Sequence, residues 1–120
     1  MNVKIIGAGS AGNHIAFALQ RLVKKITLTD ISKDALNRSK NKIYIPRYGI
    51  WSKKIYQQIE GRDEDTYYDA IIISAPPNTH LPLLKKNINK SKVFLIEKPI
   101  CEPNQKTINN LKKLIKKYKD

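Results

Sequence analysis

Apolar residues are distributed along the chain in two alternating patterns. Short apolar runs without polar alternation predict β-strands at residues 3–6, 25–29, 69–74 and 93–96. Between them, apolar residues recur every three or four positions, which predicts helices after each of these strands. Strands that alternate with helices and are apolar on both faces indicate an α/β protein with a parallel sheet.

The middle of the chain is less regular. Residues 43–45, Ile-Tyr-Ile, predict a short third strand that ends at Pro46. Ile55 and Ile59 are four residues apart, and we interpret residues 51–60 as a helix that ends at Gly61. The charged run 62–65 then predicts a solvated loop. With this third strand, the prediction is a doubly wound parallel sheet of about five strands, in a single domain spanning residues 1–120.

A final helix is predicted to begin at Pro103. Its apolar stripe consists of Ile108, Leu111, Ile115 and Tyr118. Most of the lysines between residues 112 and 117 fall off this stripe, so we interpret them as a solvated face.

A glycine motif joins the first strand to the first helix. Gly7, Gly9 and Gly12 have the spacing G-x-G-x-x-G. In a dinucleotide-binding turn, Gly7 permits the tight bend, Gly9 lets the backbone approach a pyrophosphate, and Gly12 allows close packing of helix on strand. The phosphates then lie at the N-terminus of the helix, where backbone N–H groups favour negative charge.

Asp30 ends the second predicted strand, roughly 20 residues after the glycine loop. At this position a carboxylate accepts hydrogen bonds from the ribose hydroxyls of adenosine and repels the 2′-phosphate that distinguishes NADP from NAD. Asp30 therefore favours NAD, while Lys33 and Arg38 nearby leave NADP as the less favoured alternative. A purely structural glycine-rich turn is the remaining interpretation of the motif.

The composition excludes some classes of protein. The 120 residues carry a formal net charge of +13, mostly from scattered lysines without an aromatic-interleaved basic patch. We therefore expect nonspecific affinity for polyanions but no specific nucleic-acid partner. No apolar run reaches the roughly 18 residues of a membrane span. A single cysteine, Cys101, permits no internal disulfide and fits a cytoplasmic location. No metal site is predicted.

Polar and charged residues follow the last two strands directly. Residues 74–80, Ser-Ala-Pro-Pro-Asn-Thr-His, come after the strand at 69–74, and Asn78 or Thr79 is a possible cap for the next helix. Glu97 and Lys98 follow the strand at 93–96. The carboxyl ends of parallel strands meet at one edge of the sheet, so both segments are expected beside the glycine loop, where such sheets bind ligands.

Taken together, the three motifs resemble the N-terminal half of the glucose-fructose oxidoreductase / inositol 2-dehydrogenase / rhizopine catabolism (Gfo/Idh/MocA) family of NAD(P)-dependent oxidoreductases. The resemblance covers nearly the whole chain. It implies a Rossmann domain that binds NAD, and a reaction in which hydride passes between a sugar, nucleotide-sugar or cyclitol hydroxyl carbon and the nicotinamide.

The resemblance also implies roles for individual residues. Backbone N–H groups of Gly9, Ser10, Ala11 and Gly12 hold the pyrophosphate, and Asp30 holds the ribose. A second set lines the corner beside the cofactor: Ser74, Ala75, Pro76, Asn78 and His80. Glu97 and Lys98 lie near the nicotinamide, where a cationic Lys98 faces the substrate hydroxyl and stabilises negative charge on its oxygen.

Two departures from the family pattern affect the functional prediction. The family usually has threonine just before the first proline of the corner, where this chain has Ala75. The family's substrate pocket lies in a C-terminal α/β domain that these 120 residues do not include. We therefore expect a cofactor domain that is incomplete as an enzyme without a second domain or partner chain. The alternative hypothesis is a non-catalytic NAD-binding module with a sensing or regulatory role.

Overall fold

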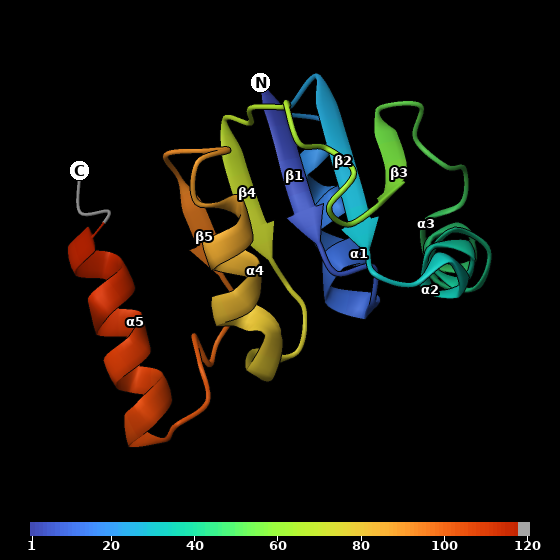
Figure 1. Cartoon of the computed structure of the whole chain (residues 1–120). Coiled ribbons are helices and arrows are strands. Elements are labelled where there is room, and N and C mark those ends of the chain that lie inside the picture. The colour runs from blue at the N-terminus through green and yellow to red at the C-terminus, as the bar shows by residue number, and fades with distance from the viewer. Residues whose placement is uncertain (118–120) are drawn as a thin grey trace.

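Five parallel strands form one sheet at the centre of the computed structural model, which describes residues 1–117 (Figure 1). The strands are β1 (Asn2–Ile6), β2 (Lys25–Asp30), β3 (Ile55–Ile59), β4 (Ala70–Ile73) and β5 (Phe94–Ile96). Their spatial order is β3-β2-β1-β4-β5, so the direction of strand progression reverses between β1 and β4. The doubly wound, five-stranded parallel sheet predicted from the sequence is confirmed, and its switch point lies beside the glycine loop.

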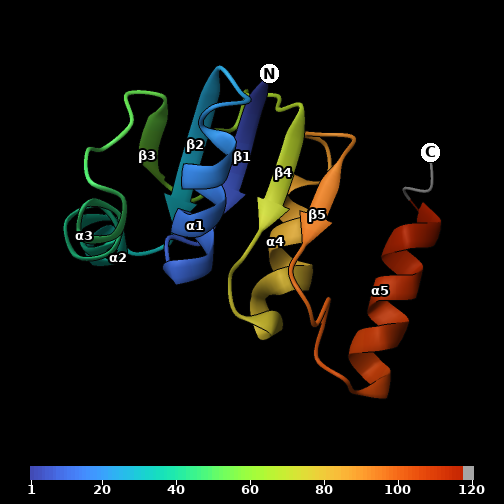
Figure 2. The same cartoon turned by 180° about the vertical axis from the view of Figure 1, so that it is seen from behind.

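Helices cover both faces of this sheet. The helical segments are α1 (Ser10–Leu19), α2 (Lys33–Arg38), the π-helix η1 (Ser39–Tyr44), α3 (Ile45–Tyr48), the 3₁₀ turn η2 (Pro77–Thr79), α4 (His80–Asn87) and α5 (Gln105–Lys117). Figures 1 and 2 show α1 on one face of the sheet and α4 on the opposite face. Within residues 1–117, no helix combines the length and hydrophobicity needed to cross a membrane.

Two apolar clusters hold the helices against the sheet. Val3, Ile5, Ile26 and Leu28 pack on the α1 side with residues of the helices that follow. Ile6, Ile71, Ile73, Leu83 and Leu84 pack on the α4 side. Burying each of these side chains contributes about 1.5–3 kcal/mol, so the sheet is a rigid platform for the loops at its edge.

The predictions for residues 43–60 are wrong in both elements. Residues 43–45 belong to a helical run instead of a strand, because the Tyr44 ring packs edge-on against Phe17 of α1 and is only 1% exposed. This tertiary contact outweighs the local preference of Ile and Tyr for strands. Residues 55–59 form β3 and not a helix, since a spacing of four residues also places Ile55 and Ile59 on one face of a strand.

The predicted solvated loop at 62–65 is confirmed for Arg62, Glu64 and Asp65, which are exposed, and is wrong for Asp63. Asp63 is only 4% exposed, and its carboxylate accepts hydrogen bonds from Lys4 Nζ at 2.7 Å, Lys90 Nζ at 2.9 Å and Tyr68 Oη at 2.7 Å. Lys4 lies in the middle of β1 and is fully buried. The loop therefore closes over a buried ionic cluster, whose partners are far apart in the sequence.

The last helix differs from its prediction in its first residue and in the residues that pack against the core. α5 begins at Gln105, after Asn104, whose side chain accepts a hydrogen bond from the N–H of Thr107 at 2.8 Å. Leu111 and Leu114 pack on the core, whereas Ile115 is 56% exposed. Tyr118, also assigned to the apolar stripe, lies outside the described residues.

Thr79 precedes α4 but does not cap it through its side chain. The hydroxyl of Thr79 donates instead to Pro76 O at 2.6 Å.

Candidate functional site

A groove of about 970 Å³ runs along the carboxyl edge of the sheet. The ends of β1, β2, β4 and β5 all open onto this edge, at the bottom of the sheet in Figure 1. Nine of the predicted site residues line the groove: Gly7, Gly9, Asp30, Ser74, Ala75, Pro76, Asn78, Glu97 and Lys98. Residues from four separate strand ends therefore face one elongated cavity.

The glycine loop has the backbone that its sequence requires. Gly7 has φ +114°, a region that favours glycine, and a Cβ there would lie 2.9 Å from the backbone of Ser74 and Ala75. A Cβ on Gly12 would lie 1.9 Å from Gly7 O, so the helix packs here without room for a side chain. Around Gly9 the space is open to 4 Å, which leaves the backbone accessible to a ligand.

Helix α1 starts directly from this loop. Its N-cap, Gly9, has no side chain, and the hydrogen bond from Asn13 N to Gly9 O is 3.0 Å long. The N–H groups of Ser10, Ala11 and Gly12 precede that bond and have no acceptor within the helix. These three residues do not themselves line the groove, but they directly follow Gly9, which does. With the positive end of the helix dipole, their N–H groups form an arrangement suited to phosphate oxygens.

Asn13 fixes the shape of the loop, a role that no sequence motif indicates. Its buried side-chain amide donates to Ala8 O at 3.0 Å and to Gly9 O at 2.7 Å. Its Oδ1 accepts a hydrogen bond of 2.8 Å from the Ser39 hydroxyl of η1. Asn13 thereby cross-links the loop to the helical run 33–48, a long-range contact that no local pattern reveals.

Asp30 is held at the end of β2 by two backbone groups. Its Oδ2 accepts from Ala8 N at 3.0 Å, and its Oδ1 accepts from Ser32 N at 3.1 Å. Ser32 itself caps α2, because its hydroxyl oxygen accepts a hydrogen bond from Ala35 N at 3.2 Å. The carboxylate is thus fixed between the glycine loop and α2, and it faces the groove. Further residues line this end: Ile31, Ala35, Arg38 and Ile43.

The second corner packs against the glycine loop. Ser74 Oγ lies 3.3 Å from both Ile6 O and Gly7 O, and donates to this backbone. His80 does not line the groove: it is 1% exposed, with Nδ1 2.9 Å from Ile100 O and Nε2 2.6 Å from Ala75 O. His80 therefore connects the segment after β4 to the segment after β5.

Glu97 and Lys98 leave the sheet at the end of β5. Glu97 N donates to Ile73 O at 3.0 Å, which extends the sheet pairing by one residue. Both side chains are exposed and line the groove, and the peptide bond from Lys98 to Pro99 is cis. Asp30 and Lys98 thus lie on different strand ends of the same cavity.

The carboxylates with shifted pKa values belong to the buried ionic cluster. Burial raises the pKa of Asp63, but hydrogen bonds from Lys4, Lys90 and Tyr68 outweigh this and hold it well below its usual range. Burial likewise opposes ionisation of Glu60, yet Lys4 and Asn87 lower its pKa below the ordinary value. Among the described residues, no member of this cluster lines the groove, so its role is structural.

These features define the class of protein: a Rossmann domain with a dinucleotide-binding glycine loop. A family model described as an oxidoreductase family with an NAD-binding Rossmann fold, Gfo/Idh/MocA, matches residues 1–120. The chain belongs to this family, and it is an NAD-binding domain of that family's oxidoreductases. The resemblance inferred from the motifs is confirmed. A comparison with curated proteins gives no match.

Solved structures share the fold. The apo scyllo-inositol dehydrogenase from Lactobacillus casei is 19% identical with a TM-score of 0.70, and the match covers 99% of this chain and 34% of that one. The myo-inositol 2-dehydrogenase from Lactobacillus plantarum is 22% identical with a TM-score of 0.66, over 98% of this chain and 33% of that one. The chain therefore spans about a third of the length of these enzymes.

Proposed function

We propose that this chain is the cofactor-binding part of an oxidoreductase that prefers NAD to NADP. The preference rests on Asp30, whose carboxylate is fixed by Ala8 N and Ser32 N at the groove. A carboxylate held in this place accepts hydrogen bonds from both ribose hydroxyls and repels a 2′-phosphate. Because two backbone groups hold the side chain, it cannot turn away from a 2′-phosphate without losing both hydrogen bonds.

The residues present fit a dinucleotide along the groove. The unpaired N–H groups at the start of α1 and the open space at Gly9 suit the two phosphates. Asp30 then lies at the adenosine ribose, and Glu97 and Lys98 lie toward the nicotinamide. A bound nicotinamide supplies the hydride acceptor or donor.

Lys98 is the residue that we assign to catalysis. It is an exposed cation that lines the groove at the end of β5, on the side where the nicotinamide of a bound dinucleotide would lie. Its ammonium group stabilises negative charge that develops on the hydroxyl oxygen as the proton leaves. A related structure, also from Lactobacillus casei, contains NAD(H) and scyllo-inositol, which supports a cyclitol or sugar as the substrate class. The remaining substrate contacts come from a second domain or a partner chain.

Calorimetric titration with NAD and NADP tests the cofactor assignment. We expect saturable NAD binding and weaker NADP binding by the wild type, and a loss of roughly tenfold or more in NAD affinity for Asp30→Ala. Asp30→Asn keeps a hydrogen-bond acceptor but removes the charge. It is expected to reduce the difference between the affinities for NAD and NADP. Asp65→Asn removes an exposed charge away from the groove and serves as the control.

Turnover separates an enzyme from a binding module. With inositols and hexoses as substrates, and with the second domain or partner chain present, Lys98→Ala is expected to abolish formation of reduced nicotinamide while leaving NAD affinity nearly unchanged. Unchanged turnover in Lys98→Ala contradicts the role of this residue. A different outcome is that the wild type binds NAD without turnover in the presence of the second domain or partner chain. That result supports the alternative of a sensing or regulatory module.

A further inference from the structure

An arginine from a distant segment lies at the start of α1. Arg47, in α3, donates a hydrogen bond from Nη1 to the hydroxyl of Ser10, the first residue of α1. Ser10 contributes one of the N–H groups that face the phosphate position. The glycine motif does not include Arg47, which is 37 residues away from Ser10 in the sequence.

Aromatic contacts determine where Arg47 is placed. The ring of its neighbour Tyr48 stacks on Phe17 of α1, with centroids 4.2 Å apart and planes inclined by 9°. The Tyr48 hydroxyl lies 3.2 Å from His14 Nδ1. Ser10, His14 and Phe17 are spaced by four and three residues, so they share one face of α1. α3 therefore packs along this face with Arg47 toward the phosphate end.

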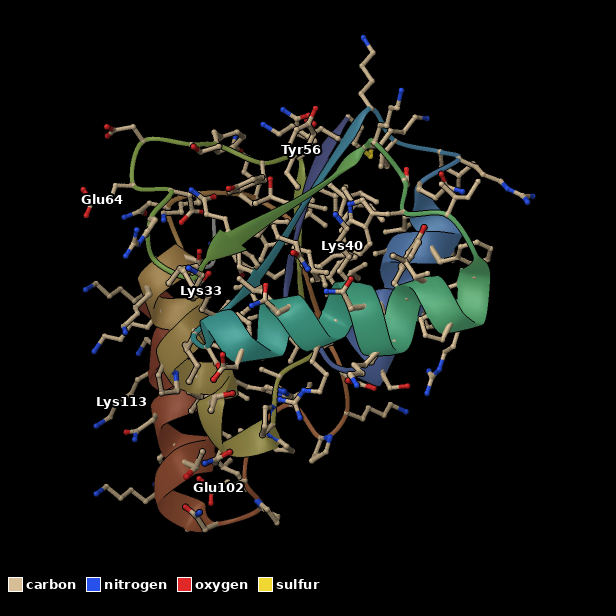
Figure 3. All side chains as sticks on the ribbon, turned by 90° about the vertical axis from the view of Figure 1, so that its right-hand side faces the viewer. Lys33, Lys40, Tyr56, Glu64, Glu102 and Lys113 are labelled. Carbon is tan, nitrogen blue, oxygen red and sulfur yellow. The ribbon has the colours of Figure 1, made fainter. Side chains whose placement is uncertain are left out.

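The helical run that carries Arg47 is also anchored at its middle. Figure 3 shows α2, η1 and α3 as one nearly continuous helix, with Lys33 near its start and Lys40 farther along. Ser39 in this run donates to Asn13, which in turn holds the glycine loop. The run and the loop thus form one connected unit, so the backbone of Arg47 is held beside the start of α1 before a ligand binds.

We propose that Arg47 is a phosphate-binding residue that completes the diphosphate site of this domain, an inference that rests on the proposed NAD-binding function. The first turn of α1 carries no acidic side chain that would compete for the cation. Ser10 uses one of the five N–H donors of the guanidinium, and the side chain is exposed. A planar guanidinium beside a helix N-terminus binds phosphate oxygens through paired hydrogen bonds.

A series of ligands distinguishes a phosphate contact from a tether between two helices. The affinities of adenosine, ADP, ADP-ribose and NAD are measured by calorimetry or chemical-shift titration for the wild type and Arg47→Gln. We expect Arg47→Gln to bind ADP, ADP-ribose and NAD roughly tenfold more weakly and adenosine unchanged. Arg47→Lys, which keeps the charge but not the fork, is expected to recover part of the loss.

Two further variants make the test specific. Arg21→Gln removes the same charge from an exposed position just beyond the C-terminal end of α1. It lowers the net charge of +13 by the same amount as Arg47→Gln, and it should leave the affinity for every ligand unchanged. Ser10→Ala removes the hydrogen bond between Ser10 and Arg47 but keeps the guanidinium. It should therefore lower the affinity for ADP less than Arg47→Gln does. Equal losses for adenosine and ADP in Arg47→Gln, or no loss, overturn the role of Arg47. Failure of the wild type to bind NAD or ADP overturns the proposed function as well.

Discussion

Lys4 Nζ lies 2.7 Å from Asp63 Oδ2, although 59 residues separate the two along the chain. Glu60 Oε1 and Asn87 Oδ1, each 2.8 Å away, accept the other two hydrogens of the ammonium group. Lys90 pairs with the second oxygen of Asp63. Two cations thus face two carboxylates, so the cluster carries no net charge and the buried lysine is fully hydrogen-bonded.

Removing Lys4 leaves two buried carboxylates with a single cation. Lys4→Met is therefore expected to lower the free energy of unfolding by about 3–5 kcal/mol, measured by urea denaturation. Lys24→Met, at an exposed position just before β2, should change it by less than about 0.5 kcal/mol. Similar effects of the two substitutions contradict the assignment of the cluster as a structural element.

The same cluster makes stability depend on pH. Asp63 and Glu60 have lower pKa values in the folded chain than their ordinary values of 3.8 and 4.5. A carboxylate with a depressed folded pKa contributes stability above its unfolded pKa, and this contribution is lost as the pH falls toward the folded pKa. The urea midpoint is expected to decrease steeply below about pH 4. Asp63→Asn should show a shallower decrease, and parallel curves for the two proteins contradict this prediction.

Gly9 and Gly12 are expected to respond differently to an added methyl group. Gly12→Ala forces a Cβ against Gly7 O, so it should lower the free energy of unfolding by about 1–3 kcal/mol. Gly9→Ala meets no protein atom within 4 Å, so its thermal unfolding should match the wild type while NAD affinity falls. A Gly9→Ala variant that binds NAD normally contradicts a close approach of the diphosphate at this residue.

Local sequence signals correctly predicted which residues lie at the carboxyl edge of the sheet. The glycine spacing, Asp30 at the end of β2 and the polar residues after β4 and β5 are each short motifs that depend on neighbouring residues. Their positions along one groove follow from parallel strand topology, which aligns the carboxyl ends of all strands. For this reason the sequence alone was sufficient to place Asp30 and Lys98 at the same edge of the sheet.

Contacts between distant segments could not be predicted in the same way. The strand predicted at 43–45 is helical because Tyr44 packs against Phe17, and the loop containing Asp63 is buried because Lys4 lies beneath it. Asn13 and Arg47 carry no motif, and their positions depend on how η1 and α3 lie on α1. In each case the deciding partner is at least 26 residues away, beyond the range of periodicity and capping rules.

The buried ammonium of Lys4 also bears on how the chain folds during its synthesis. Asn87, one of its three acceptors, leaves the ribosome 83 residues after Lys4 does. Until then, burying β1 on its α4 side leaves the ammonium group without one of its three acceptors, which costs free energy. The hydrogen bonds of Lys4 can therefore be completed only after α4 has been translated.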